Sequence, residues 1–184
     1  MNAITYRSGD VSDALCIGVL GTQVFLDTYA PEGIRTALAR EVLGNFSMPA
    51  IQAQMESPWA AFILAERAGH LIGFAQLTHG ARHPLVPYRR ATELNRLYVH
   101  ERFTSQGVGK ELLQGAEALA ASHGAAAMWL TAWVQNQRAV LYYPRRGYKD
   151  VGASTYSFEG DHYENRVFVK VLEHGGPAAS QAAG

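Results

Sequence analysis

Short runs of apolar residues, separated by glycine, proline and polar residues, predict alternating strands and helices along this chain. Residues 3–7 alternate between apolar and polar side chains, as a short strand does. A helix follows, for which Asp10 and Ser12 offer capping groups. Its apolar face is expected to carry Val11, Leu15, Val19 and Phe25. Gly18 and Gly21 lie in the same helix and should weaken it, because glycine is a poor helix former.

A second helix is predicted to begin at Pro31, since proline suits the first helical turn. Apolar residues recur along it every four positions, at Ile34, Leu38, Val42 and Phe46. This helix should end near Ser47, before Pro49. Two apolar runs follow at residues 60–66 and 71–78, and the polar residues between them predict a hairpin turn.

The middle of the chain predicts a parallel strand–helix–strand unit. Residues 80–90 hold two prolines, one histidine and three arginines, which is typical of a long exposed loop. A strand is expected at residues 92–99, and a helix from Val108 to about Ser122. Residues 127–134 are apolar on both alternating faces, as expected of a central strand that is covered on both sides.

The end of the chain predicts one short helix and a second hairpin. Asn136 should cap the helix, which is expected to finish around Tyr143 because Pro144 disfavours a helical conformation in the residue before it. Residues 148–158 and 161–172 then form strands joined by a tight turn.

Length and composition favour one domain over residues 1–172. A chain of 184 residues that is 48% hydrophobic can bury one sizeable core. Residues 173–184, rich in Gly, Ala and Ser, are expected to be a disordered tail. Lys plus Arg equals Asp plus Glu at 16 each, so overall charge attracts neither nucleic acid nor an anionic membrane.

Cysteine and histidine usage indicates a reducing environment and no metal. The single cysteine, Cys16, cannot form an internal disulfide, and the seven histidines show no spacing typical of zinc sites. No segment reaches the roughly 18 apolar residues of a membrane span. We therefore expect a soluble, cytoplasmic protein.

A glycine-bearing loop at residues 104–110, Thr-Ser-Gln-Gly-Val-Gly-Lys, lies between a predicted strand and helix. Unpaired backbone N–H groups and the helix dipole attract phosphate at such a position. The pattern differs from the Walker loop, which needs Ser or Thr where Glu111 stands. It also differs from the dinucleotide fingerprint, whose third glycine would replace Leu112.

Two motifs resemble those of the GNAT family of N-acetyltransferases. Residues 93–99 (Glu-Leu-Asn-Arg-Leu-Tyr-Val), followed by 106–109 (Gln-Gly-Val-Gly), are similar to the family's acyl-CoA loop. Residues 136–148, from Asn136 to Tyr148, are similar to its second motif. The resemblance implies a mixed α/β (α+β) fold. It has a mostly antiparallel central sheet of about seven strands, about four flanking helices and one parallel strand–helix–strand unit.

The resemblance also implies acetyl-CoA as the acyl-donor substrate, without a metal. The donor-binding residues carried over are Leu97, Tyr98, Val99, Thr104, Ser105, Gln106, Gly107, Val108, Gly109, Lys110, Asn136 and Tyr142. A backbone N–H near Val99, freed where the strand diverges from its neighbour, is the implied donor to the thioester oxyanion. For Asn136, helix capping alone is the alternative. Thr104 departs from the family's usual Arg or Gln, so backbone N–H groups must do most of the phosphate binding.

The implied reaction is attack of an amine on a thioester. At pH 7 only roughly one alkyl amine in a few thousand is neutral, so a proton acceptor is useful. Glu93 is the candidate base, because similar enzymes often have a glutamate near this point. The alternative is a solvated carboxylate paired with Arg96 or another arginine. Tyr143 matches the family's acid and would protonate the leaving thiolate. The alternative is that Tyr143 is an aromatic core residue. Pro144, which follows it, could shift the direction in which the tyrosine points.

Acceptor choice is expected to lie in the first two helices and the loop before Thr92. Residues 25–32 are similar to a bacterial branch that acetylates polyamines and other small amines. Asp27, Glu32 and Glu56 could attract a polycation, or could be ordinary surface charges. A peptide or protein amine is an alternative acceptor. A degenerate acyl-CoA sensor and an interaction module with an unrelated ligand are alternatives to an enzyme, and a homodimer is common among similar proteins.

Overall fold

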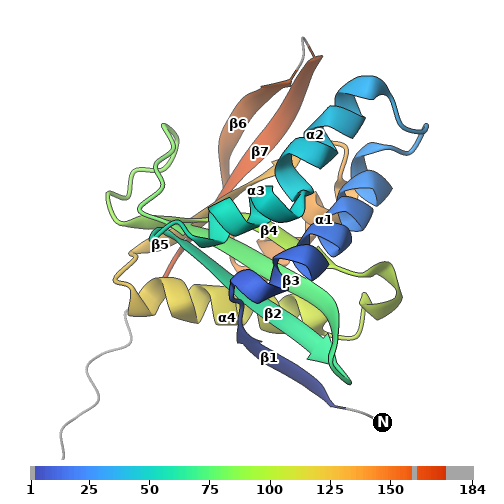
Figure 1. Ribbon diagram of the computed structural model, residues 1–184. Helices are drawn as coiled ribbons and strands as arrows, with labels where there is room; N and C mark the ends of the chain where they lie inside the picture. The colour runs from blue at the N-terminus through green and yellow to red at the C-terminus, as the bar shows by residue number, and fades with distance from the viewer. Residues whose placement is uncertain (1–2, 159–160, 173–184) are drawn as a thin grey trace, which may run out of the picture.

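One seven-stranded sheet organises the molecule (Figure 1). The computed structural model describes residues 3–158 and 161–172. The strands follow the order β1-β2-β3-β4-β5-β7-β6. Their bounds are β1 Ile4–Ser8, β2 Ala60–Arg67, β3 His70–His79, β4 Ala91–Val99, β5 Ala127–Trp133, β6 Lys149–Phe158 and β7 Asp161–Val171. Neighbouring strands are antiparallel except β4 and β5, which confirms the predicted parallel unit.

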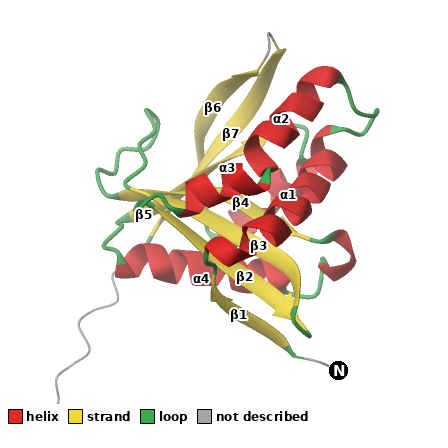
Figure 2. Ribbon diagram, viewed as in Figure 1, coloured by secondary structure: helices red, strands yellow, loops and turns green. Residues whose placement is uncertain are grey.

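Helices cover both faces of the sheet (Figure 2). Their bounds are α1 Ala14–Tyr29, α2 Thr36–Phe46, α3 Met48–Met55, α4 Val108–Ser122 and α5 Gln137–Tyr142. The first three pack together on one face, and α4 lies across β2, β3 and β4 on the other. Five helices in the described residues exceed the expected four, since α3 begins with Pro49 in its first turn. Proline starts a helix there instead of ending one.

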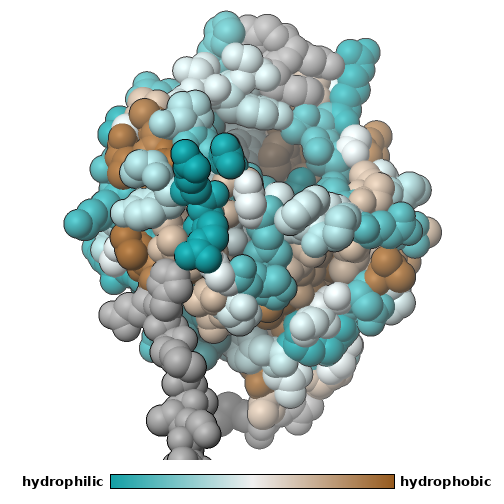
Figure 3. Space-filling model, turned by 90° about the vertical axis from the view of Figure 1, so that its left-hand side faces the viewer, coloured by the Kyte–Doolittle hydropathy of each residue, from teal (hydrophilic) through white to brown (hydrophobic). Residues whose placement is uncertain are grey.

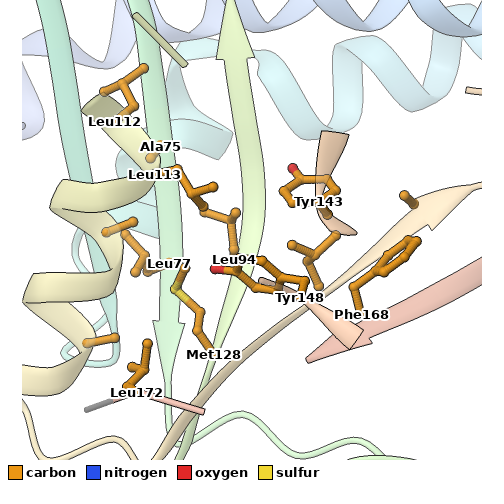
Figure 4. Close-up of a cluster of buried hydrophobic side chains, with 14 of the residues drawn as sticks. Ala75, Leu77, Leu94, Leu112, Leu113, Met128, Tyr143, Tyr148, Phe168 and Leu172 are labelled. Atoms are coloured by element: carbon orange, nitrogen blue, oxygen red, sulfur yellow. The ribbon is translucent and has the colours of Figure 1, made fainter. Parts of the chain in front are cut away.

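The main core lies between α4 and the sheet. Leucine and methionine side chains of α4, β3, β4 and β5 meet there, and Tyr143, Tyr148 and Phe168 extend the same cluster beyond the helix (Figure 4). A second core joins α1, α2 and α3 to the opposite face, and a third lies beneath the 80–90 loop. Seen from the side of this loop, the surface is mostly hydrophilic and is hollowed below the far end of β6 and β7 (Figure 3).

The predicted apolar face of α1 is wrong. Val11, Leu15 and Val19 are 47%, 58% and 65% exposed, whereas Ala14, Ile17 and Leu20 are buried. The two glycines decide the orientation, because a Cβ on Gly18 would lie 2.2 Å from the Phe46 carbonyl oxygen, and one on Gly21 would lie 2.4 Å from the Phe46 ring. These glycines let α2 approach α1 closely, so they hold the pair together.

One helix boundary and the membrane-span expectation also differ from the prediction. Helix α2 begins at Thr36, five residues after Pro31, and Ile34 remains exposed. The stretch Val11–Tyr29 just meets the length and hydropathy of a membrane span, contrary to expectation, but it forms the packed helix α1. The 67–70 hairpin turn is confirmed, with Ala68 and Gly69 at positive φ. The predicted turn at residues 159–160 and the predicted tail lie outside the described residues.

Candidate functional site

The site begins where two parallel strands separate. β4 and β5 pair only from Ala91 opposite Ala127 to Glu93 opposite Trp129. β4 also contains a bulge at Asn95, where its register with β3 shifts. Beyond these points the two strands diverge, and the backbone of β4 facing β5 has no strand partner. A cavity of about 800 Å³ occupies this split.

The glycine-bearing loop forms one end of the cavity. Ser105 and Gly107 both have positive φ, 62° and 85°, and Gly107 is the residue from which α4 begins. The first hydrogen bond of α4 runs from the Glu111 N–H to the Gly107 carbonyl at 3.1 Å. The three N–H groups before it, at residues 108–110, therefore emerge from the helix start, where they suit an anion.

Thr104 closes the turn that leads into this loop. Its hydroxyl donates to the Glu101 carbonyl at 2.8 Å, so the side chain is used within the loop. The Gln106 side chain does the same, because its amide donates to the Arg102 carbonyl at 2.9 Å. Phosphate binding would thus rest on backbone N–H groups and Lys110, as the departure at Thr104 led us to expect.

Helix α5 forms the opposite wall. The Asn136 side chain accepts from the Ala139 N–H at 3.1 Å, so it caps the helix, and the same residue lines the cavity. Pro144 begins a one-turn 3-10 helix. A residue at this first position makes no helical hydrogen bond through its N–H, so proline costs nothing there. Tyr143 keeps helical dihedrals (φ −66°, ψ −40°), contrary to the expected effect of the following proline.

Two adjacent tyrosines enter the wall from the end of α5. Tyr143 is 8% exposed, contacts the rings of Tyr148 and Phe168, and lines the cavity. Burial raises its pKa well above the ordinary tyrosine value, which keeps the phenol protonated. The Tyr142 hydroxyl is buried without a hydrogen-bond partner in the described residues and lies 3.8 Å from where a Cβ on Gly109 would stand. A ligand group in the cavity could satisfy it.

Glu93 is set back from the cavity. It lies at the last paired position of β4, opposite Trp129, and it is half-buried. Burial raises the pKa of its carboxyl, and Asn95 opposes this rise through a hydrogen bond. The expected alternative, a carboxylate paired with Arg96, is not what the structure has. Arg96 donates to the side-chain oxygens of Gln54 and Gln76 and covers the Phe46 ring.

Most of the residues predicted from the sequence meet around one cavity. Those that line it are Leu97, Tyr98, Val99, Thr104, Ser105, Gly107, Gly109, Lys110, Asn136, Tyr142 and Tyr143. Glu93, Gln106 and Val108 do not. Val108 is 1% exposed and belongs to the core beneath α4.

Sequence reasoning missed two lining residues of α1, Val24 and Thr28, and two arginines of the second motif. Val24, Asp27 and Thr28 reach the cavity from α1, far from either motif. Arg138 and Arg146 add positive charge inside the second motif, and Arg138 pairs with Glu101 at 3.2 Å. The arginines could have been recognised from their four-residue spacing on either side of Tyr142. Of the lining residues of α1, only Asp27, within residues 25–32, was singled out from the sequence.

A family model now accounts for this arrangement. The model of the acetyltransferase (GNAT) family matches residues 32–148, which contain the split strands, the loop and α5. The chain belongs to the GNAT family. An uncharacterized N-acetyltransferase of Mycobacterium tuberculosis is 30% identical over 143 residues, which cover 78% of this chain and 85% of that relative. Family membership makes this GNAT protein an acetyl-CoA-dependent acyltransferase.

Solved structures share the fold. The PaiA N-acetyltransferase of Thermoplasma acidophilum, solved with coenzyme A, has a TM-score of 0.70 and 20% identity, over 92% of this chain and 99% of that one. YncA of Salmonella typhimurium, solved with acetyl-CoA, has a TM-score of 0.65 and 21% identity, over 97% and 99%. Within the described residues, no group of three or more His, Cys, Asp or Glu side chains is placed to hold a metal ion.

Proposed function

We propose that this GNAT protein moves an acetyl group from acetyl-CoA to a primary amine by direct attack, and that the acceptor is a small amine or polyamine. The observation that carries the proposal is the cavity in the β4–β5 split. It has the free backbone N–H groups of a helix start at one end, a tyrosine of raised pKa in its wall and an unpaired carboxylate, Asp27, on its α1 side. Asp27 makes no ion pair among the described residues, so it could attract an ammonium group.

The donor would lie along the split with its pyrophosphate on the loop. The N–H groups of residues 108–110, with Lys110 beside them, would bind the phosphates. Asn136 and the Tyr142 hydroxyl would contact the pantetheine arm, and an unpaired N–H of β4 near Val99 would hold the thioester oxygen. These roles use backbone and side-chain groups that have no other partner or that already line the cavity.

Glu93 would prepare the nucleophile. An amine attacks only when neutral, and a carboxylate of raised pKa is a better proton acceptor than an ordinary glutamate. Because Glu93 does not line the cavity, a water molecule would relay the proton. The amine nitrogen then bonds to the carbonyl carbon, and the oxygen takes the negative charge.

Tyr143 would complete the transfer. As the carbon–sulfur bond breaks, the phenol gives its proton to the thiolate and recovers one from solvent, so the products are an N-acetyl amide and CoA thiol. A raised pKa ensures that the phenol carries its proton, although it also makes Tyr143 a weak acid. Since a thiolate with a pKa of about 8.5 leaves without much help, loss of the acid should cost at most about 10² to 10⁴ in rate.

An acceptor screen with thiol release as the readout tests the proposal. We expect acetyl-CoA to be consumed with polyamines or small amines, and Tyr143→Phe to slow this severely while Tyr142→Phe mainly weakens donor binding. Turnover with peptides alone would assign a peptide or protein amine acceptor. Donor binding without turnover on polyamines, amino acids and peptides would favour the sensor role instead.

Compartment and assembly are part of the same proposal. The one cysteine, Cys16, is a free thiol, which fits a reducing cytoplasm. We also propose that the protein forms a homodimer, as similar proteins commonly do. Light scattering on the purified protein measures it, and a monomeric mass at working concentration would rule it out.

A further inference from the structure

We call the cavity in the β4–β5 split the donor cavity. A second cavity, of about 690 Å³, lies next to the donor cavity. We name it the basic cavity. The β2–β3 turn forms one side of it and the segment after β4 forms the other, at the lower right of Figure 1. Consecutive residues of the chain line the two cavities. Gln23 and His100 line the basic cavity, and the residues that follow them, Val24 and Glu101, line the donor cavity.

The charges that line the basic cavity have one sign. Arg67, Arg102, His70 and His100 line it, and none of its lining residues is a carboxylate. Neither arginine makes an ion pair within residues 3–158 and 161–172. Each arginine has one acidic neighbour in sequence, and both of these carboxylates pair elsewhere. Glu66 pairs with Arg7 at 2.6 Å, and Glu101 lines the other cavity and pairs with Arg138 at 3.2 Å. Two unpaired guanidinium groups beside one small cavity favour an anion.

Local hydrogen bonds prepare these donors. The His100 Nδ1 accepts from the Arg102 N–H at 3.2 Å, so in the neutral ring the proton is on Nε2, which can donate to a ligand. The His100 N–H donates to the Ile72 carbonyl at 2.9 Å, which ties the segment after β4 to β3. Arg67 lies over the Phe103 ring, 5.8 Å from its centroid, so its guanidinium is held in place by packing.

We propose that the basic cavity binds a phosphate group carried by a small molecule with an apolar or planar body. A guanidinium group can donate two parallel hydrogen bonds to two oxygens of one phosphate. Two arginines with a histidine N–H therefore suit a doubly charged phosphate better than a singly charged carboxylate ligand. Leu71, Ile72 and Phe103 supply an apolar side for the body of the ligand. The volume is within the range of small-molecule sites.

Two sources could supply such a phosphate, and titration calorimetry on the full chain distinguishes them. The first source is the nucleotide end of the donor, which carries a 3′-phosphate. In that case CoA binds at least about tenfold more tightly than 3′-dephospho-CoA, and Arg67→Gln with Arg102→Gln removes the difference. The second source is a separate phosphorylated compound. Then both forms of CoA bind equally, but phenyl phosphate raises the melting temperature of the protein saturated with acetyl-CoA, and the double variant abolishes this rise.

The matched control is Arg82→Gln with Arg89→Gln, which makes the same charge change in the 80–90 loop, away from the basic cavity. It should behave as the unaltered protein in both experiments. Arg102 is exposed, so Arg102→Gln alone keeps the fold and tests the site if the double variant is unstable. The proposal is overturned if neither effect is seen, or if either effect survives in a folded double variant. These outcomes do not depend on which amine is acetylated.

Discussion

At the scale of single residues, burial alters the two groups that the proposed chemistry uses most. Glu93 and Tyr143 both have a raised pKa, and desolvation is the main cause in each case. The raised pKa has opposite effects on the two catalytic roles. It makes the Glu93 carboxylate a stronger base, and it makes the Tyr143 phenol a weaker acid. Base catalysis should therefore matter at least as much as acid catalysis in this protein.

Glu93→Gln tests that expectation. We expect a loss of about 10² to 10⁴ in kcat/KM at neutral pH. In the unaltered enzyme, activity should fall as pH drops through the raised pKa of Glu93, because protonation removes the base. This acid limb should disappear from the pH profile of the variant. Glu164→Gln, at an exposed carboxylate away from the cavity, is the control. An unchanged acid limb in Glu93→Gln would assign the base elsewhere.

Motifs determined which site residues could be found from the sequence. The loop, Asn136 and both tyrosines were recognisable because backbone N–H groups, a cap and an aromatic pair recur at set spacing. Gln106 and Val108 lie in the same motif, but one bonds back to the Arg102 carbonyl and the other packs under α4. A motif therefore places a segment at the site without telling which of its side chains face the ligand.

At the scale of elements, turn chemistry made most strands predictable, whereas helix faces were harder. The hairpin at 67–70 and the β4–α4–β5 unit are confirmed, because glycines and apolar runs mark their ends. Helix α3 was missed, since Pro49 was interpreted as a stop. The face of α1 was wrong because large apolar residues were assumed to face inward, when close approach to α2 required glycine there instead.

Glycine substitutions in α1 and α2 test this packing. Gly18→Ala should destabilise the protein by about 1–3 kcal/mol, because its Cβ meets a backbone carbonyl that cannot move aside alone. Gly44→Ala in α2 meets nothing within 4 Å and should stabilise it by about 0.5–1 kcal/mol. Urea unfolding midpoints measure both. A neutral Gly18→Ala would mean that the two helices lie farther apart than described.

A histidine contact joins the end of β3 to the end of α4. The His79 and His123 rings stack at 4.3 Å between centroids, and the His79 Nδ1 lies 3.1 Å from the Thr92 hydroxyl. Burial, and then the neighbouring His123, lower the pKa of His79 below its ordinary value of 6.5. The folded state thus binds this proton less readily than the unfolded state. Neutral His79 therefore contributes fully to stability above about pH 6.5, and this contribution is lost as pH falls through the lowered pKa of His79.

His79→Phe keeps a stacked ring and removes the titration. The melting temperature of the unaltered protein should fall more steeply between pH 7.5 and 5 than that of the variant. Carboxylates such as Asp13 and Asp150 titrate in both proteins and cancel in the comparison. An exposed histidine, replaced in His162→Asn, provides the control. Parallel pH curves for the unaltered protein and His79→Phe would show that the stack plays no part in acid sensitivity.

At the scale of the whole molecule, the donor cavity unites segments that are distant in the chain. Its walls run from Val24 in α1 to Arg146 after α5, and the diverging strands lie between them. Apart from Asp27, the lining residues of α1 could not be predicted locally, because the position of α1 depends on how Gly18 and Gly21 pack against α2. A ligand in this cavity would contact both faces of the sheet and so oppose unfolding of the entire domain.

Donor binding should therefore stabilise the whole protein. At a hundredfold excess over Kd, a ligand that binds only the folded state adds about 2.7 kcal/mol, which is roughly 5–10 °C in melting temperature for a domain of this size. Gly109→Leu should abolish the shift, because the added side chain grows from a Cβ that already lies 3.7 Å from Val99 and 3.8 Å from the Tyr142 hydroxyl. Gly44→Ala, outside the cavity, should keep it. If acetyl-CoA produces no shift in the unaltered protein, the cavity serves another ligand, and the interaction module considered from the sequence becomes the better account.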